Sequence, residues 1–265
     1  MNAINVNAIK YLKKFCINDV VPFDCPICKR SCLIIDRQSL NKVETESSKK
    51  LRKYVEFEPE WIEYSYSVVY RCANPHCSEI VQSVGNGGEE QFYSYDEYDQ
   101  PEDAYYESFF VPKLFLPAIN YFNIPETTPD KVKGLVLNAF ELTPISPSSA
   151  VNKIRAAIEA ILTLNGINGK DDQGKFVTLN ERIKSIIESH PLHPIKSKML
   201  AIKWLGNAGS HEDDDIELED LFDSFEILET MLNVLYNHNP RINKLVDSVI
   251  QHRGPISRRT RRSIN

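Results

Sequence analysis

Two closely spaced cysteine pairs are the residues of this 265-residue chain best suited to chemistry. Two residues separate Cys25 from Cys28, and four separate Cys72 from Cys77. A short spacing lets one tight turn direct two thiolates at a metal ion, and two such turns supply the four sulfur ligands of a structural zinc site. We therefore predict one structural zinc ion per chain, held by these four cysteines.

Other interpretations of the cysteines stay open. Buried cysteines also act as small hydrophobic residues, although two short-spaced pairs are more specific for a metal than isolated cysteines are. Cys32 and His76 are alternative metal ligands, each able to take the place of one of these four cysteines. Cys16 has no obvious partner, and we expect Cys16 and Cys32 to be structural. Because a zinc ion held by four thiolates has no open coordination position, we expect the site not to be catalytic.

A second set of polar residues lies in the C-terminal half of the chain. Arg155 and Glu159 are four residues apart among regularly spaced apolar residues, so on a helix they can form an ion pair. Asn207 and His211 share one face if a helix continues through the small residues between them, which permit close approach of another helix or of a ligand. The candidate ligand-binding residues are Arg155, Glu159, Lys203, Asn207 and His211.

Each of these residues also has a structural interpretation. An Arg–Glu pair inside a helical bundle often only ties helices together. Asn207 and His211 can cap the acidic segment that follows, Glu212 to Asp220, whose carboxylates are favourable at a helix N-terminus. That acidic run would also repel a polyanion.

Hydrophobic periodicity indicates the elements that position these residues. Residues 3–15 have the apolar spacing of a short amphipathic helix. Residues 25–84 combine apolar stretches and the β-rich run Trp61 to Tyr70 with the cysteine pairs, which is typical of a small β-ribbon. After Pro129 the period becomes helical and predicts a bundle of helices, with a capping box at Thr178 and Glu181. The longest apolar stripe, Leu218 to Tyr236, predicts a central helix.

The charge pattern indicates the remaining segments. No Lys or Arg occurs between Arg71 and Lys113, and Asn86-Gly87-Gly88 indicates a break in the chain. We interpret the acidic, Tyr-rich segment that follows as a solvated linker, in preference to an anionic surface that mimics a partner. The last residues are arginine-rich and predict a flexible tail. The expected segments are 1–88, an N-terminal helix and zinc ribbon; 89–129, an acidic Tyr-rich linker; 130–252, a helical bundle; and 253–265, a basic flexible tail.

Composition excludes several classes of protein. Hydrophobic residues make up 42% of the chain and charged residues 26%, which argues against wholesale disorder. No apolar run reaches the roughly 18 to 20 residues that cross a bilayer, and the N-terminus lacks a signal-peptide core. We therefore expect a cytoplasmic protein without a membrane partner. Six cysteines are too few for a disulfide scaffold.

The cysteine turns, the helix with Arg155 and Glu159, the segment Gly206 to His211 and the helix Glu226 to Tyr236 resemble the bacterial domain of unknown function 4145. That family is similar to the HEPN superfamily of nucleotide-binding helical bundles. The resemblance implies an α+β fold, mainly α, with a small N-terminal β zinc ribbon followed by a HEPN-like helical bundle. It also implies a homodimer, for which Ala208, Gly209 and Ser210 supply a small contact surface.

Many HEPN proteins are metal-free ribonucleases whose active site pairs an arginine with a histidine. The sequence departs from that motif, because Gly206 stands where the resemblance places the arginine. We therefore expect a non-catalytic binding or scaffolding module of a bacterial defence system that recognises RNA, DNA, nucleotide or a partner defence enzyme. The alternative is a ribonuclease with His211 as general acid or base, Asn207 beside it, and Arg155 or Lys203 on the phosphate.

Overall fold

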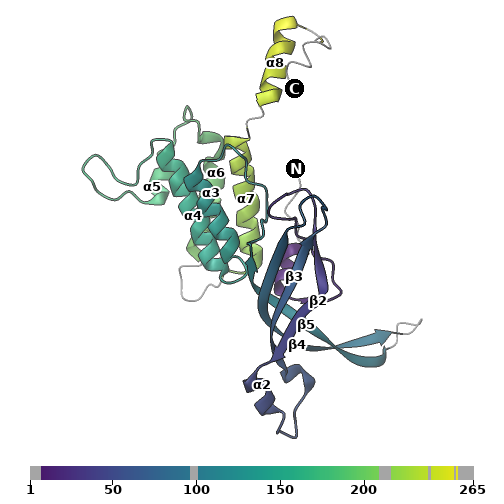
Figure 1. Cartoon of the computed structure of the whole chain (residues 1–265). Helices are drawn as coiled ribbons and strands as arrows, with labels where there is room; N and C mark the ends of the chain where they lie inside the picture. The colour runs from purple at the N-terminus through teal and green to yellow at the C-terminus, as the bar shows by residue number, and fades with distance from the viewer. Residues whose placement is uncertain (1–6, 96–100, 209–215, 238–239, 254, 256–265) are drawn as a thin grey trace.

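An antiparallel sheet fills most of the N-terminal region, and helices fill the C-terminal region (Figure 1). The structure is a computed structural model that describes residues 7–95, 101–208, 216–237, 240–253 and 255. The five strands lie in the order β1-β5-β4-β3-β2. Their bounds are β1 (Phe15–Cys16), β2 (Leu33–Glu44), β3 (Glu63–Cys72), β4 (Ile80–Tyr95) and β5 (Pro101–Leu116).

Strands β4 and β5 are the longest, at 16 residues each. The pairing of β3 with β4 ends at Glu63 and Gly88, whereas β4 and β5 stay paired out to Tyr95 and Pro101. The two strands therefore leave the sheet as a two-stranded arm, which Figure 1 shows projecting beyond β2 and β3.

This sheet corrects the predicted fold class. A mainly α protein with a small zinc ribbon before a HEPN-like bundle is wrong, because a five-stranded antiparallel sheet forms most of the N-terminal region. The linker predicted for 89–129 is also wrong where that segment forms the arm and β5. The other segment boundaries stay predictions.

The glycines of β4 explain the error. The predicted chain break at Asn86-Gly87-Gly88 lies inside β4, as does Gly85, and β5 comes very close to these glycines. A Cβ on Gly85 would overlap the carbonyl oxygen of Val111, and a Cβ on Gly87 would meet the Phe110 ring at 3.0 Å. Their missing side chains make room for neighbouring strands, so they mark close packing in the sheet.

One face of the sheet carries the core of the N-terminal region. Helix α1 (Asn7–Lys13) covers this inner face, and the Tyr11 hydroxyl lies 2.6 Å from that of Tyr70. Aromatic rings fill the space beneath α1, with Tyr11 stacked on Phe15 at 4.5 Å between ring centroids. The buried aromatic residues of this core are Tyr11, Phe15, Phe23, Tyr66, Tyr70, Phe110 and Phe115.

The helices predicted after Pro129 are present. Their bounds, with the short α2 at the far end of the sheet, are α2 (Glu46–Leu51), α3 (Asp130–Leu142), α4 (Pro147–Leu164), α5 (Leu179–Lys184), α6 (Lys196–Ala208), α7 (Leu218–Tyr236) and α8 (Pro240–His252). The predicted capping box opens α5, since Thr178 accepts from the Glu181 amide and Glu181 accepts from the Thr178 amide. None of the helices described is long and apolar enough to cross a bilayer.

Tyr121 joins the sheet to the helices. Its ring lies 6.3 Å from that of Phe23 in the sheet core, 5.5 Å from Phe140 on α3, and 5.4 Å from Phe225 on α7. An ion pair of 2.6 Å between Lys13 and Glu219 adds a second link. The buried apolar residues therefore form one continuous cluster.

The close approach of β5 to Gly85 generates a prediction about stability. Gly85→Ala should lower the free energy of unfolding by about 1–3 kcal/mol, because the added methyl group overlaps backbone that must shift. Gly134→Ala is the matched control. Gly134 lies in α3 with open space around its Cβ position, so this change should raise stability by about 0.5–1 kcal/mol.

Urea denaturation followed by far-ultraviolet circular dichroism measures both changes. A Gly85→Ala protein as stable as the wild type would contradict the close packing of β4 on β5.

Candidate functional site

The four cysteines predicted to bind zinc lie together at one end of the sheet. Cys25 and Cys28 belong to the loop before β2, Cys72 ends β3, and Cys77 lies in the turn before β4. Their sulfur atoms all lie within 4.8 Å of one another. Segments that are far apart in sequence therefore bring four sulfur ligands to one point.

Each cysteine pair sits in a turn of similar construction. The residue after the second cysteine is left-handed in both, with φ of 52° at Lys29 and 50° at Ser78. The Lys29 amide donates to the Cys25 carbonyl, and the Ser78 amide donates to the Asn74 carbonyl. These closed turns direct the cysteine side chains inward.

Backbone amides point at the sulfur atoms. The Asn74 amide donates to Cys72 Sγ at 3.4 Å, and the Glu79 amide donates to Cys77. The Arg30 amide lowers the pKa of the Cys28 thiol to about 7, whereas burial raises the pKa of Cys72 to about 12. In each of the three cases the donor lies two residues after the cysteine, where it stabilises a thiolate.

The distances fit a metal ion. Cys25 Sγ lies 3.8 Å from Cys77 Sγ, and Cys28 Sγ lies 3.6 Å from Cys72 Sγ. Four sulfurs placed about 2.3 Å from one tetrahedral ion are separated by about 3.8 Å, and a disulfide would bring two of them to about 2.05 Å. The site can therefore hold a metal ion through four thiolates. The substitute ligands Cys32 and His76 lie outside this set.

The structure brings together only some of the candidate ligand-binding residues of the helical region. Arg155 and Glu159 face each other along α4, with Nε and Oε1 4.0 Å apart. Gly206 on α6 faces the same helix, because a Cβ built on it would lie 3.7 Å from Arg155 Cδ. Lys203 is buried, with Nζ 3.3 Å from the centre of the Trp204 ring.

The other two candidates cannot be placed. Asn207 lies within α6, but its side chain is outside the part of the structure that is described. His211 lies outside the described residues altogether. Their predicted shared face therefore stays a prediction.

Arg182 is a buried charge that the sequence reasoning missed. Its guanidinium on α5 donates to the backbone carbonyls of Glu159 and Ile167 and to the Thr163 hydroxyl, at 2.6 to 3.2 Å. Burial lowers the pKa of Arg182. The side chain satisfies carbonyls at the end of α4 and so has a structural role. No local pattern marks it, because its partners come from another helix.

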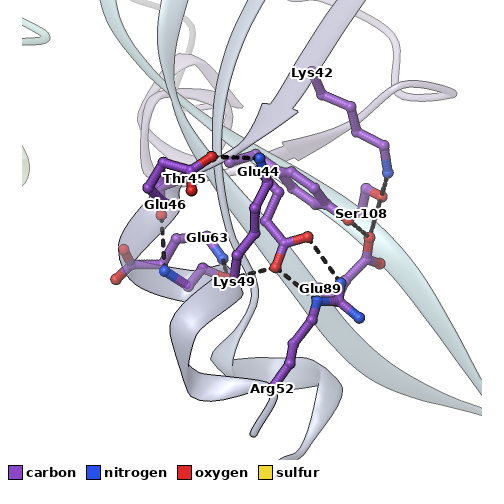
Figure 2. Close-up of polar contacts among 11 residues, drawn as sticks. Lys42, Glu44, Thr45, Glu46, Lys49, Arg52, Glu63, Glu89 and Ser108 are labelled. Carbon is purple, nitrogen blue, oxygen red and sulfur yellow. Dashed lines mark hydrogen bonds and ion pairs between the residues drawn. The ribbon is translucent and has the colours of Figure 1, made fainter.

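A belt of polar side chains crosses the inner face of the sheet beyond the aromatic core (Figure 2). Glu89 accepts from the Tyr64 hydroxyl at 2.6 Å, from Ser108 at 2.8 Å and from Lys42 at 3.3 Å. Burial alone would raise the pKa of Glu89, but these donors more than offset it and hold the pKa below its ordinary value. Since these side chains supply one another's hydrogen-bond partners, the belt stabilises the base of the arm.

The belt extends to α2. Glu44 on β2 accepts two hydrogen bonds from Arg52, at 3.0 and 2.9 Å, and one from Ser48. The guanidinium of Arg52 holds the pKa of Glu44 below its usual value. This bidentate pair attaches α2 to the end of the sheet, as Figure 2 shows.

Two family models match the chain. Residues 13–115, which include the sheet and the four cysteines, match "Domain of unknown function (DUF8608)". Residues 138–251, which include most of the helices, match "Domain of unknown function (DUF4145)", as the resemblance predicted. No curated protein and no solved structure shows significant similarity to the chain. Neither match confirms a zinc ribbon or a HEPN-like bundle.

The sulfur cluster predicts metal binding that depends on Cys72 and not on Cys32. The protein purified under reducing conditions should hold about one metal ion per chain, and Cys72→Ser should lose most of it because one of four ligands is removed. Cys32→Ser is the control, since Cys32 is exposed and lies outside the cluster. Inductively coupled plasma mass spectrometry measures the content. Equal loss in both variants would contradict the assignment of the ligands.

Proposed function

We propose that the protein is a non-catalytic binding module of a bacterial defence system, with a structural zinc ion in its sheet. In this proposal the helical part recognises nucleic acid, nucleotide or a partner enzyme. The defence role and the ligand class rest on the resemblance to HEPN-like bundles. The non-catalytic character rests on the packing of Gly206, which is the observation that carries the proposal.

Gly206 occupies the contact between two helices. A Cβ at this position would lie 3.5 Å from Val151 Cγ1 and 3.7 Å from Arg155 Cδ. These are ordinary van der Waals distances, so Gly206 lies in the contact between α4 and α6 and supplies no phosphate-binding guanidinium there. Loss of one preorganised donor of this kind costs about a hundredfold to a thousandfold in rate.

Zinc is the metal that the ligand set favours. Four thiolates in a tetrahedral arrangement suit zinc or an iron centre, and the closed, paired turns are those of structural zinc sites. A zinc ion with four protein ligands leaves no position for water or substrate. Its role in the proposal is to hold the two cysteine turns together.

Arg155 and Lys203 are the cations proposed to contact the ligand, together with the arginine-rich tail. The Arg155 side chain is about one-third exposed and lies beside Gly206. Lys203 lies on α6, the helix that faces it, although its side chain is buried against Trp204. Phosphate contacts of this kind weaken as salt rises.

The ribonuclease alternative predicts cleavage that depends on His211. We expect the wild type, His211→Ala and Gly206→Arg to leave labelled single-stranded RNA uncut in the presence of EDTA. The first two lack the arginine donor, and a side chain added at Gly206 would point toward Val151 and Arg155 on α4. Gel electrophoresis of the RNA measures this. Cleavage by the wild type that is lost in His211→Ala would establish the ribonuclease and overturn the proposal.

Binding is measured separately. Fluorescence anisotropy with the same RNA should show binding by the wild type that is weakened several-fold by Arg155→Gln, with a smaller salt dependence. Lys153→Gln, on the same helix, is the matched control and should bind like the wild type. Equal effects of both substitutions would argue against a site at Arg155.

A further inference from the structure

The first cysteine turn receives a hydrogen bond from a distant part of the chain. The Asn120 side chain donates from Nδ2 to the carbonyl oxygen of Pro26 at 3.2 Å, across 94 residues of sequence. Pro26 lies between Cys25 and Cys28, two of the four cysteines whose sulfurs converge. A side chain that fixes this carbonyl therefore also fixes the direction in which the first turn presents its two sulfur atoms.

The second cysteine turn supplies its own side-chain contact. The Asn74 side chain accepts from the His76 amide at 3.0 Å, and the Asn74 carbonyl accepts from the Ser78 amide. Within the described part of the chain, Asn120 is the one side chain that donates to the backbone of the first turn, residues 25–30. The second turn is thus closed locally, whereas the first depends on a residue from the segment that leads to the helices.

Buried neighbours hold Asn120 in place and connect it to the helices. Ile119 and Tyr121 are 1% and 8% exposed, and both belong to the continuous apolar core. The Tyr121 ring packs against Phe140 on α3 and against Phe225 on α7, at 5.5 and 5.4 Å between ring centroids. Because Asn120 lies between two residues of this close-packed core, a shift of the core also moves the Asn120 amide.

We propose that Asn120 is a positioning residue for the metal site, and that it couples metal occupancy of the cysteine cluster to the packing of the helices. The inference rests on the proposed zinc site and adds to it a residue that the cysteine spacing does not identify. The Asn120 amide holds the first turn with its sulfur atoms directed toward the ion. A bound ion in turn fixes the Pro26 carbonyl, so that the segment 119–122 is held in one position against α3 and α7.

Coupling of this kind is reciprocal. If ordered packing around Asn120 strengthens metal binding by some factor, metal binding favours that packing by the same factor. Groups that orient metal ligands without touching the ion contribute about tenfold to a hundredfold to metal affinity. Asn120 acts on the turn that carries two of the four cysteines, and the second turn keeps its own contacts. We therefore expect an effect at the lower end of this range.

Asn120→Asp tests the role of the amide, because it keeps the size of the side chain and replaces the donor with a carboxylate that repels the Pro26 carbonyl. Asn120→Ala is a second variant that removes the donor without adding charge. Asn165→Asp is the matched control. Asn165 Nδ2 also donates to a backbone carbonyl, that of Ile161 at 2.8 Å, but it lies at the end of α4.

Competition with a chromophoric zinc chelator measures the metal affinity. Asn120→Asp and Asn120→Ala should bind zinc about tenfold more weakly than the wild type, and Asn165→Asp should bind it like the wild type. Amide hydrogen exchange followed by mass spectrometry measures the coupling. Removal of zinc from the wild type should speed exchange in peptides from α7, and the same removal should change this exchange less in Asn120→Asp.

Other outcomes would overturn the proposal. Wild-type zinc affinity in both Asn120 variants would show that Asn120 does not position the turn. An equal loss of affinity in Asn165→Asp would assign the effect to a general loss of stability. Exchange in α7 of the wild type that is the same with and without zinc would exclude the coupling. A wild type that binds no zinc would overturn the zinc site as well, so the failure of the site is distinguishable from the failure of this inference.

Discussion

The meeting of four cysteine sulfurs is the constraint on which the N-terminal region depends. These thiols come from two turns separated by more than 40 residues of sequence, and they converge without forming disulfides. A cation at their centre would offset the repulsion between thiolates. The turns flank β2, β3 and β4, so holding them together aligns three strands at one end of the sheet. The Asn120 side chain donates to the Pro26 carbonyl at 3.2 Å, which connects the first turn to the segment that leads to the helices.

Tyr121, the residue after Asn120, extends the connection from the cysteine turns to the helices. Tyr121 packs against Phe23 on one side and against Phe140 and Phe225 on the other, so the sheet core and the helical core share one aromatic cluster. A disturbance at the cysteine turns is therefore transmitted to the helices through a short, continuous set of contacts.

Local patterns in the sequence predicted local features well. The cysteine spacing identified four sulfurs that lie close enough together to hold a metal ion, and apolar periodicity with capping residues identified the helices from α3 to α8. Features that depend on distant residues were not predictable in this way. Gly87 and Gly88 looked like breaks in the chain because the aromatic residues that cover them, Phe110 and Phe109, belong to the neighbouring strand β5. Arg182 was missed because its partners are carbonyls of α4.

In the proposed function the zinc ion is structural and the helical part is a binding surface, so the most direct question is how the metal is bound. X-ray absorption at the zinc edge of the purified protein answers that question directly. We expect a single shell of four sulfur atoms at about 2.3 Å, since the four cysteines close the coordination sphere. A shell that contains oxygen or nitrogen ligands, or a protein that holds no zinc, would contradict a closed structural site.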